Sequence, residues 1–288
     1  MTEPDVNTTQ FLAPDGTPVP SVTSATMREI DRIAIDETGP NLFQMMEHAG
    51  LNLALQTIEV LGADWRARSV VVLAGRGGNG GGGICAARHL ASRGVRVTLV
   101  LAGPLLTGSV PAFQHAIYGG TAGREATADA VAIERPDLII DALIGYGLTA
   151  APTGGTADLI SWSVSHRAPV LSLDVPSGVD ATTGGVPGVV MRPRWTLTLA
   201  LPKTGLTPRN AGQVVLADLG IPRVTFERAG VPWVSHSVRA PASNWRLRRR
   251  QLRTRQLDVP PRAPVTACAA RDYFHVGRRS TKERLICH

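Results

Sequence analysis

A short apolar run that leads directly into a glycine-rich stretch is the feature that most constrains the fold of this chain. Residues 69–74 read Ser-Val-Val-Val-Leu-Ala, and seven glycines fall within the nine positions 75–83. An apolar run of this length is typical of a strand that is buried on both faces. A helix is expected from about Gly82 to Arg93, and a further apolar run at 95–101 completes a unit of the length of a β-α-β crossover.

The same alternation of apolar runs and helical periodicity continues through the chain. A helix is predicted to begin near Ser24 and a second to cover 42–61. Beyond the glycines, helices are predicted over 111–119 and 157–165, and strands at 137–143, 169–174, 195–200 and 213–218. Strands separated by helices predict a doubly wound, mostly parallel α/β sheet with helices on both faces. Right-handed crossovers place the strand-to-helix loops at the carboxyl edge of such a sheet, where ligands bind.

Composition changes at both ends of the chain and suggests three segments. Residues 1–20 are polar and are expected to form a disordered lead-in, and residues 21–235 to form the folded domain. In 236–288, 13 Lys and Arg stand against 3 acidic residues, which leaves 17 against 20 in the rest of the chain. The net charge of +7 therefore comes from this basic tail, which is expected to be disordered. The folded part has no basic excess that would indicate a nucleic-acid surface.

The N-terminus and the cysteines predict a soluble, cytoplasmic protein. The N-terminus has neither the positive segment nor the apolar segment of a signal peptide. No run of about 18 apolar residues exists that would predict a membrane span. The three cysteines, Cys85, Cys268 and Cys287, show no spacing typical of a disulfide framework or a zinc site. The sequence leaves the oligomeric state open, with a homodimer as one expectation.

The glycine stretch favours a phosphate- or nucleotide-binding site of an unusual kind. Gly75, Gly77 and Gly80 satisfy the pattern G-x-G-x-x-G between a predicted strand and a predicted helix. A tight turn without a ligand is the alternative, but a turn needs fewer glycines. A Rossmann dehydrogenase would place an acidic residue, or an arginine for a 2′-phosphate, at the end of the next strand, whereas residues 101–104 read Leu-Ala-Gly-Pro. A P-loop is excluded because no Gly-Lys-Ser/Thr follows the glycines.

Two aspartates close predicted strands at the same edge of the sheet. Asp141 and Asp174 should both point into the crevice beside the glycine stretch. A buried carboxylate costs free energy unless it is hydrogen-bonded, paired or metal-bound, so a purely loop-fixing role is the alternative for each. Asn79, Asp141 and Ser177 together offer oxygen ligands, which suit a simple cation rather than zinc.

Six segments carry a family resemblance, in the order 27–32, 45–50, 75–83, 141–147, 174–178 and 201–205. Over about residues 22–222 the chain resembles the NAD(P)H-hydrate epimerase family, also called the YjeF N-terminal domain. The resemblance implies a Rossmann-like isomerase of metabolite repair, which interconverts the R and S hydrates of NADH and NADPH at nicotinamide C6. It also implies bound potassium.

The resemblance implies a role for each site residue. Potassium would be held by Asn79, Asp141 and Ser177, helped by main-chain carbonyls. Asp174 would contact the substrate, and its position at a strand end makes it our candidate for the catalytic acid–base group. The hydrated dinucleotide would be held by Gly78, Asn79, Gly80, Gly81 and Gly82 and by the turn Gly145, Tyr146, Gly147, Leu148, Thr149, Ala150 and Ala151.

The chain departs from the family pattern at three positions. The family usually has Asn where this chain has Gly78, Asp where it has Gly82, and a basic residue near Ala150. The absence of a buried polar interaction costs about 1–3 kcal/mol, so these departures predict a weakened epimerase. Two other classes are the alternatives: a non-catalytic binding module associated with nucleotides or RNA, and a Rossmann oxidoreductase, which the missing ribose acid disfavours.

Overall fold

A seven-stranded parallel sheet forms the centre of the protein in a computed structural model that describes residues 9–13, 15–131, 135–232 and 253–256. All of its strand pairs are parallel. The strand order is β5-β4-β3-β6-β7-β8-β9. The strands are β3 (Ser69–Ala74), β4 (Arg96–Leu101), β5 (Arg124–Glu125), β6 (Leu138–Ala142), β7 (Val170–Leu173), β8 (Trp195–Leu199) and β9 (Gln213–Ala217). This order confirms the predicted doubly wound α/β fold.

The strand order reverses between β3 and β6. From β3 the chain builds β4 and β5 toward one side, and it then returns to place β6 on the other side of β3. At such a reversal the two neighbouring strand-to-helix loops diverge and leave a crevice at the carboxyl edge. The glycine stretch follows β3 and Asp141 lies in β6, so the sequence of strands brings the two predicted site segments together.

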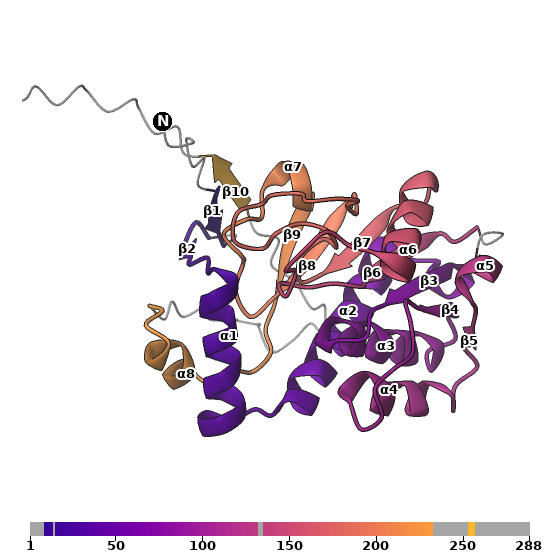
Figure 1. Cartoon of the computed structure of the whole chain (residues 1–288), viewed down its shortest axis with the longest axis horizontal. Coiled ribbons are helices and arrows are strands. Elements are labelled where there is room, and N and C mark those ends of the chain that lie inside the picture. Colours follow the sequence, from indigo (N-terminus) through magenta and orange to yellow (C-terminus); the bar gives the residue numbers. More distant parts are fainter. Residues whose placement is uncertain (1–8, 14, 132–134, 233–252, 257–288) are drawn as a thin grey trace, which may run out of the picture. The chain divides into compact units, whose positions relative to one another are not determined.

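Helices cover both faces of the sheet (Figure 1). In β3, Val70 and Val72 join one core and Val71 and Leu73 join the other, because successive side chains of a strand point to opposite faces. The first core is formed with α1 (Ser24–Ile33), α2 (Leu42–Leu61), α3 (Gly78–Ala91) and α4 (Val110–Tyr118). The second is formed with α5 (Ala128–Val131) and α6 (Gly154–Ser165). Short helical segments complete the described chain: η1 (Ala34–Thr38), η2 (Trp65–Ala67), α7 (Pro208–Ala211) and α8 (Arg223–Arg228).

A second, small antiparallel sheet corrects two expectations about the chain ends. It has the order β10-β1-β2, with β1 (Thr9–Leu12), β2 (Pro18–Val19) and β10 (Arg253–Gln256). The expected disordered lead-in is therefore wrong for residues 9–12 and 18–19, because Phe11 and Val19 are buried in the main core. β10 lies in the expected disordered tail, and the rest of 236–288 lies outside the described residues. Among the described helices, none has the length and apolar character needed to cross a membrane.

Candidate active site

The N-terminus of α3 lies within the glycine stretch. The helix begins at Gly78, four residues before the predicted start, and Gly77 caps it without a side chain. The first amide that bonds back into the helix is that of Gly81, which donates to the Gly77 carbonyl at 3.1 Å. The amides of Gly78, Asn79 and Gly80 therefore have no partner within the helix. Together with the helix dipole, they form an end that attracts an anion such as a pyrophosphate.

Most of the glycines serve close packing, which the sequence alone did not indicate. A Cβ at Gly80 would overlap the Gly75 carbonyl, and a Cβ at Gly83 would overlap the side chain of Ala142 in β6. Gly78, by contrast, is exposed, and its Cβ would meet only Met46 Sδ at 3.8 Å. The helix is thus pressed against the sheet over one turn, while its first residue stays open to a ligand.

The surroundings of Gly82 indicate a packing role for this glycine. A Cβ at Gly82 would lie 2.9 Å from Leu173 Cδ2 and 3.6 Å from Ala49 Cβ, in the interior between α3 and its neighbours. A carboxylate at this position would start among apolar side chains and not at the open end of the helix. The glycine therefore fits the packing of this chain, and the geometry gives no support to the predicted role of Gly82 in substrate binding.

Asp141 is fully buried at the centre of a hydrogen-bonded group of residues. Ser177 donates its hydroxyl to Asp141 Oδ1 at 2.5 Å and its main-chain N–H to Oδ2 at 3.0 Å. Ser172 Oγ donates to Oδ2 at 2.7 Å, and the Leu143 N–H donates to Oδ1 at 3.3 Å. Burial raises the pKa of the Asp141 carboxyl, and these hydrogen bonds oppose the shift. No ion pair to Asp141 occurs among the described residues.

Asp174 forms a buried ion pair that the strand-end pattern did not reveal. Lys203 Nζ donates to Asp174 Oδ1 and, at 2.9 Å, to the Leu199 carbonyl. The Tyr146 N–H donates to Asp174 Oδ2 at 3.0 Å. The side chains of Asp174 and Lys203 are 4% and 1% exposed. Lys203 belongs to the segment 201–205, which carries part of the family resemblance. Its place in that segment is the only feature of the sequence that indicates a functional role for Lys203.

Asp31 of α1, a second residue without a predicted role, is connected to the Asp174–Lys203 pair through Tyr146. Tyr146 donates its phenol hydroxyl to Asp31 Oδ2 at 2.5 Å, and Lys203 Nζ lies 5.8 Å from the centre of the Tyr146 ring. Burial raises the pKa of the Asp31 carboxyl, against the hydrogen bond from Tyr146 and the charge of Lys203, and the charge of Asp174 adds to the increase. Burial and Asp31 likewise raise the pKa of Tyr146.

The loop that contains Gly145 connects the residues around Asp174 with the residues around Asp141. A Cβ at Gly145 would lie 2.9 Å from Asp174 Oδ2 and 3.2 Å from Asn79 Oδ1, so the glycine allows both side chains to approach the loop. Asn79 Nδ2 is buried and has no hydrogen-bond partner among the described residues. The Ile144 N–H donates to Ser177 Oγ at 2.9 Å, which ties the same loop to the Asp141 group.

The structure thus brings together most of the predicted site residues at the carboxyl edge. Asn79, Gly145, Tyr146 and Asp174 are close neighbours, and Asp141 and Ser177 form a second group joined to them by the loop after β6. The remaining loop residues lie farther along the same turn: Gly147, Thr149, Ala150 and Ala151 are exposed, and Leu148 is half-buried.

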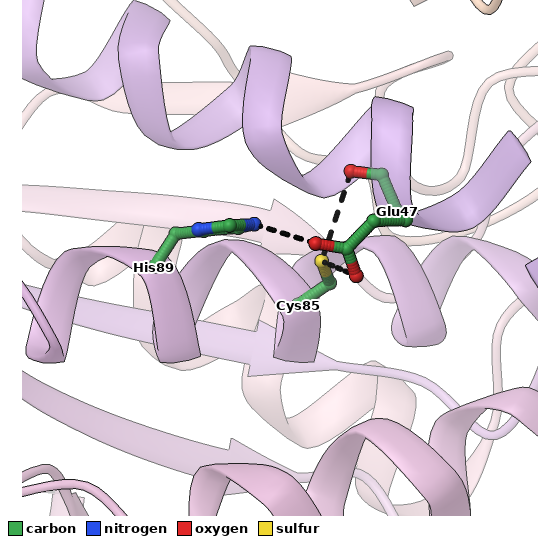
Figure 2. Close-up of side chains that lie close together, drawn as sticks. All are labelled: Glu47, Cys85 and His89. Atoms are coloured by element: carbon green, nitrogen blue, oxygen red, sulfur yellow. Dashed lines mark hydrogen bonds and ion pairs between the residues drawn. The ribbon is translucent and has the colours of Figure 1, made fainter. Parts of the chain in front are cut away.

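A cluster of possible metal ligands lies between α2 and α3, outside this site (Figure 2). Glu47, Cys85 and His89 place their ligand atoms within 4.8 Å of one another. Arg88 already donates to both Glu47 oxygens, at 2.6 and 2.7 Å, and Arg93 Nη1 lies 3.1 Å from His89 Nδ1. His89 Nε2 faces Glu47 Oε1 at 2.8 Å and Arg88 Nη2 at 3.2 Å. The guanidinium groups of Arg88 and Arg93 therefore already contact ligand atoms that a metal cation would need.

The thiol in this cluster is held in its neutral form. Burial and the charge of Glu47 raise the pKa of Cys85 to about 12, so almost no thiolate exists at neutral pH. Burial would raise the pKa of Glu47 as well, but hydrogen bonds from Arg88 and its neighbours outweigh that effect and lower the pKa to about 2. The hydrogen bonds and ion pairs of this cluster thus connect α2 with α3.

Comparisons with known proteins place the chain in a family. The family described as YjeF-related protein N-terminus matches residues 42–205. An NAD(P)H-hydrate epimerase of Dehalogenimonas lykanthroporepellens is 48% identical over 222 residues, which cover 77% of this chain and 91% of that protein. The bifunctional NAD(P)H-hydrate repair enzyme Nnr of Salinibacter ruber is 36% identical over 230 residues, which cover 73% of this chain but only 42% of that protein.

The fold agrees with these sequence relationships. The crystal structure of the yeast protein YNL200c superimposes with a TM-score of 0.67, over 76% of this chain and 98% of that one, at 21% sequence identity. The family match covers more than half of the chain, and the Dehalogenimonas protein is similar over nearly its whole length. The chain therefore belongs to the YjeF-related protein N-terminus family, which includes the NAD(P)H-hydrate epimerases.

Proposed function

We propose that the chain is an NAD(P)H-hydrate epimerase, which interconverts the R and S hydrates of NADH and NADPH at nicotinamide C6. The names of its relatives support this activity. The observation that carries the proposal is the buried Asp174–Lys203 pair beside the open N-terminus of α3. The N-terminus of α3 suits the pyrophosphate, and Asp174 would serve as the acid–base group for the reacting ring.

The reaction needs one acid–base group in a fixed position. The ring nitrogen next to C6 supplies the electron pair that expels the hydroxyl. The hydroxyl leaves as water with the proton that the Asp174–Lys203 pair carries, and the Asp174 carboxyl group passes this proton on. Addition of water to the opposite face of the ring returns that proton to the same group. Asp174 is the group that we assign to these proton transfers, because it is the carboxylate next to Asn79 and Gly145.

Lys203 and Tyr146 are positioning residues for this carboxylate. Lys203 holds Oδ1 and the Tyr146 N–H holds Oδ2, so the Asp174 side chain cannot rotate freely. Asp31 fixes the Tyr146 ring through the phenol hydroxyl. A carboxylate held in one orientation loses less entropy when the reacting atoms meet it, which is how positioning contributes to rate.

The residues around Asp141 fit a bound potassium ion. Asp141 and Ser177 offer oxygen atoms from one hydrogen-bonded group, and Asn79 offers its Oδ1 from beside Gly145. The fully buried Asp141 carboxylate lacks a cationic partner among the described residues. A monovalent cation held there would supply the missing positive charge and stabilise the loop after β6. If so, replacing potassium in the buffer by the larger choline ion should lower the melting temperature. An unchanged melting temperature would contradict a potassium site.

A single-epimer experiment tests the proposed activity. Purified protein is mixed with one hydrate epimer of NADPH, and the two epimers are separated by chromatography over time. We expect the protein to bring the mixture to its equilibrium ratio faster than the spontaneous reaction does. A rate equal to that of buffer alone would contradict the proposal.

A cytoplasmic location of the protein and its assembly into a homodimer remain predictions from the sequence.

A further inference from the structure

Arg76 extends from the glycine stretch to the end of β4. Its Cδ lies 3.5 Å from the position that a Cβ of Gly103 would take, and Gly103 is the second residue after β4. The side chain is exposed, and it has no hydrogen bond or ion pair within the part of the chain that the structure describes. The side chain of Arg76, unpaired among the described residues, thus passes beside the residues that follow β4, where the sequence itself offers no charged residue.

The end of this strand determines which dinucleotide a Rossmann-like site prefers. An acidic residue there binds the 2′-hydroxyl of NAD, whereas a nearby arginine accommodates the 2′-phosphate of NADP. Residues 101–104 contain neither, so the sequence by itself offers no candidate. The structure corrects this view, because Arg76 reaches the strand end through space from the preceding loop.

An apolar hollow of 540 Å³ opens beside the same strand end. Its lining includes Leu101, the last residue of β4, together with Leu105, Phe43 and Phe113. The two phenylalanine rings meet edge to face, 5.3 Å apart, yet both side chains remain 43–52% exposed. An exposed aromatic pair in a hollow of this size suits a flat aromatic ligand such as adenine.

Two of the helices that line the hollow also contact the N-terminal turn of α3. Phe43 lies one helical turn before Met46, whose sulfur faces the open Gly78 at the start of α3. On the other side, Gly81 of α3 packs against Val110 and Pro111 at the start of α4. A dinucleotide whose pyrophosphate lies at the N-terminus of α3 could therefore extend its adenosine along the end of β4.

We propose that the hollow binds the adenine of the substrate and that Arg76 binds its 2′-phosphate, so that the chain prefers hydrated NADPH to hydrated NADH. This inference rests on the proposed epimerase function for the identity of the substrate. An arginine bonded to a phosphate contributes enough for a preference of about tenfold or more in kcat/KM.

The first test compares kcat/KM for the two hydrates. Arg76→Gln should lower the value for hydrated NADPH about tenfold and leave that for hydrated NADH within about twofold. Arg66→Gln is the matched control, because Arg66 lies before β3, at the amino edge of the sheet, and stacks on Trp65. Equal use of both hydrates by the wild type, or an equal loss on both in Arg76→Gln, would overturn the proposal.

The second test measures binding without catalysis, so that it stands apart from the proposed function. Calorimetry with adenosine 2′,5′-bisphosphate and with 5′-AMP should show tighter binding of the bisphosphate. Arg76→Gln should weaken the bisphosphate alone, and Phe113→Ala should weaken both ligands. Failure of either ligand to bind, or an Arg76→Gln variant that binds both as the wild type does, would overturn the proposal. If binding follows the prediction but no hydrate is epimerised, only the proposed function fails.

Discussion

Asp174 has a backbone conformation that few side chains adopt. Its φ of 68° is one of two positive values at non-glycine residues in the described chain, the other being 60° at Ala200. Asp and Asn tolerate this region better than other residues, and such strain concentrates at functional sites. The Asp174 N–H donates to the Leu197 carbonyl at 2.7 Å, which helps to hold the residue in place between β7 and β8.

The buried ion pair predicts a large effect of removing one partner. Lys203→Met leaves the Asp174 carboxylate buried without its cation and should lower the free energy of unfolding by about 3–5 kcal/mol. Urea denaturation measures this change. The double variant Lys203→Met, Asp174→Asn removes both charges and should recover most of the stability. A single variant within about 1 kcal/mol of the wild type would show that the pair contributes little.

The raised pKa of Asp31 predicts a pH-dependent stability difference. A carboxyl whose pKa is higher in the folded than in the unfolded protein contributes stability that is full below the unfolded value. That contribution is lost as pH rises through the folded value. Asp31→Asn lacks this titration, so its melting temperature relative to wild type should increase from pH 4 to pH 7. A difference that stays constant or falls over this range would contradict the predicted direction.

Some site residues could be predicted from the sequence and others could not, for a physical reason. Asp141 lies near the end of β6, and Asp174 and Ser177 follow β7. Topology alone brings these strand ends to one edge. Lys203 and Asp31 come from the segments 201–205 and 27–32, which approach the edge only through tertiary packing. Arg76 was likewise visible in the sequence, but its position at the end of β4 was not.

At the scale of elements, the packing of α3 against its neighbours determines where glycine is required. The helix α3 begins at Gly78 and not at the predicted Gly82, although glycine has a low helix propensity. In this protein tertiary packing outweighs that propensity, since the side chains absent at Gly80, Gly82 and Gly83 would overlap or crowd their neighbours. The helix 42–61, which has ordinary composition, was predicted with its observed bounds.

A matched pair of variants tests this packing account. Gly83→Ala places a Cβ against the side chain of Ala142 and should lower the free energy of unfolding by about 1–3 kcal/mol. Gly78→Ala meets only the flexible Met46 side chain and should be neutral or stabilising by up to about 1 kcal/mol. Chemical denaturation of both variants measures the difference. Equal stabilities would contradict close packing as the reason for glycine at position 83.

At the scale of the whole molecule, none of the seven strands of the main sheet comes from the basic tail. The seven strands lie within 69–217, whereas β10 pairs only with β1 in the small sheet. Truncation after Val234 removes β10 and should lower the melting temperature by no more than about 4 °C, or about 1 kcal/mol for a domain of this size. A truncated protein that fails to fold would show that the tail belongs to the domain.

The rate of epimer equilibration by Asp174→Asn, measured beside the wild type, tests the central claim most directly. Asn accepts the positive φ and keeps the size of the side chain, but it leaves Lys203 buried without its anion and cannot exchange a proton with the substrate. The rates are therefore compared at a temperature at which the variant is still folded. With saturating substrate we predict a rate at least about 100-fold below the wild type. Circular dichroism and substrate binding serve as controls for folding. An Asp174→Asn variant that equilibrates the epimers as fast as the wild type would contradict the account.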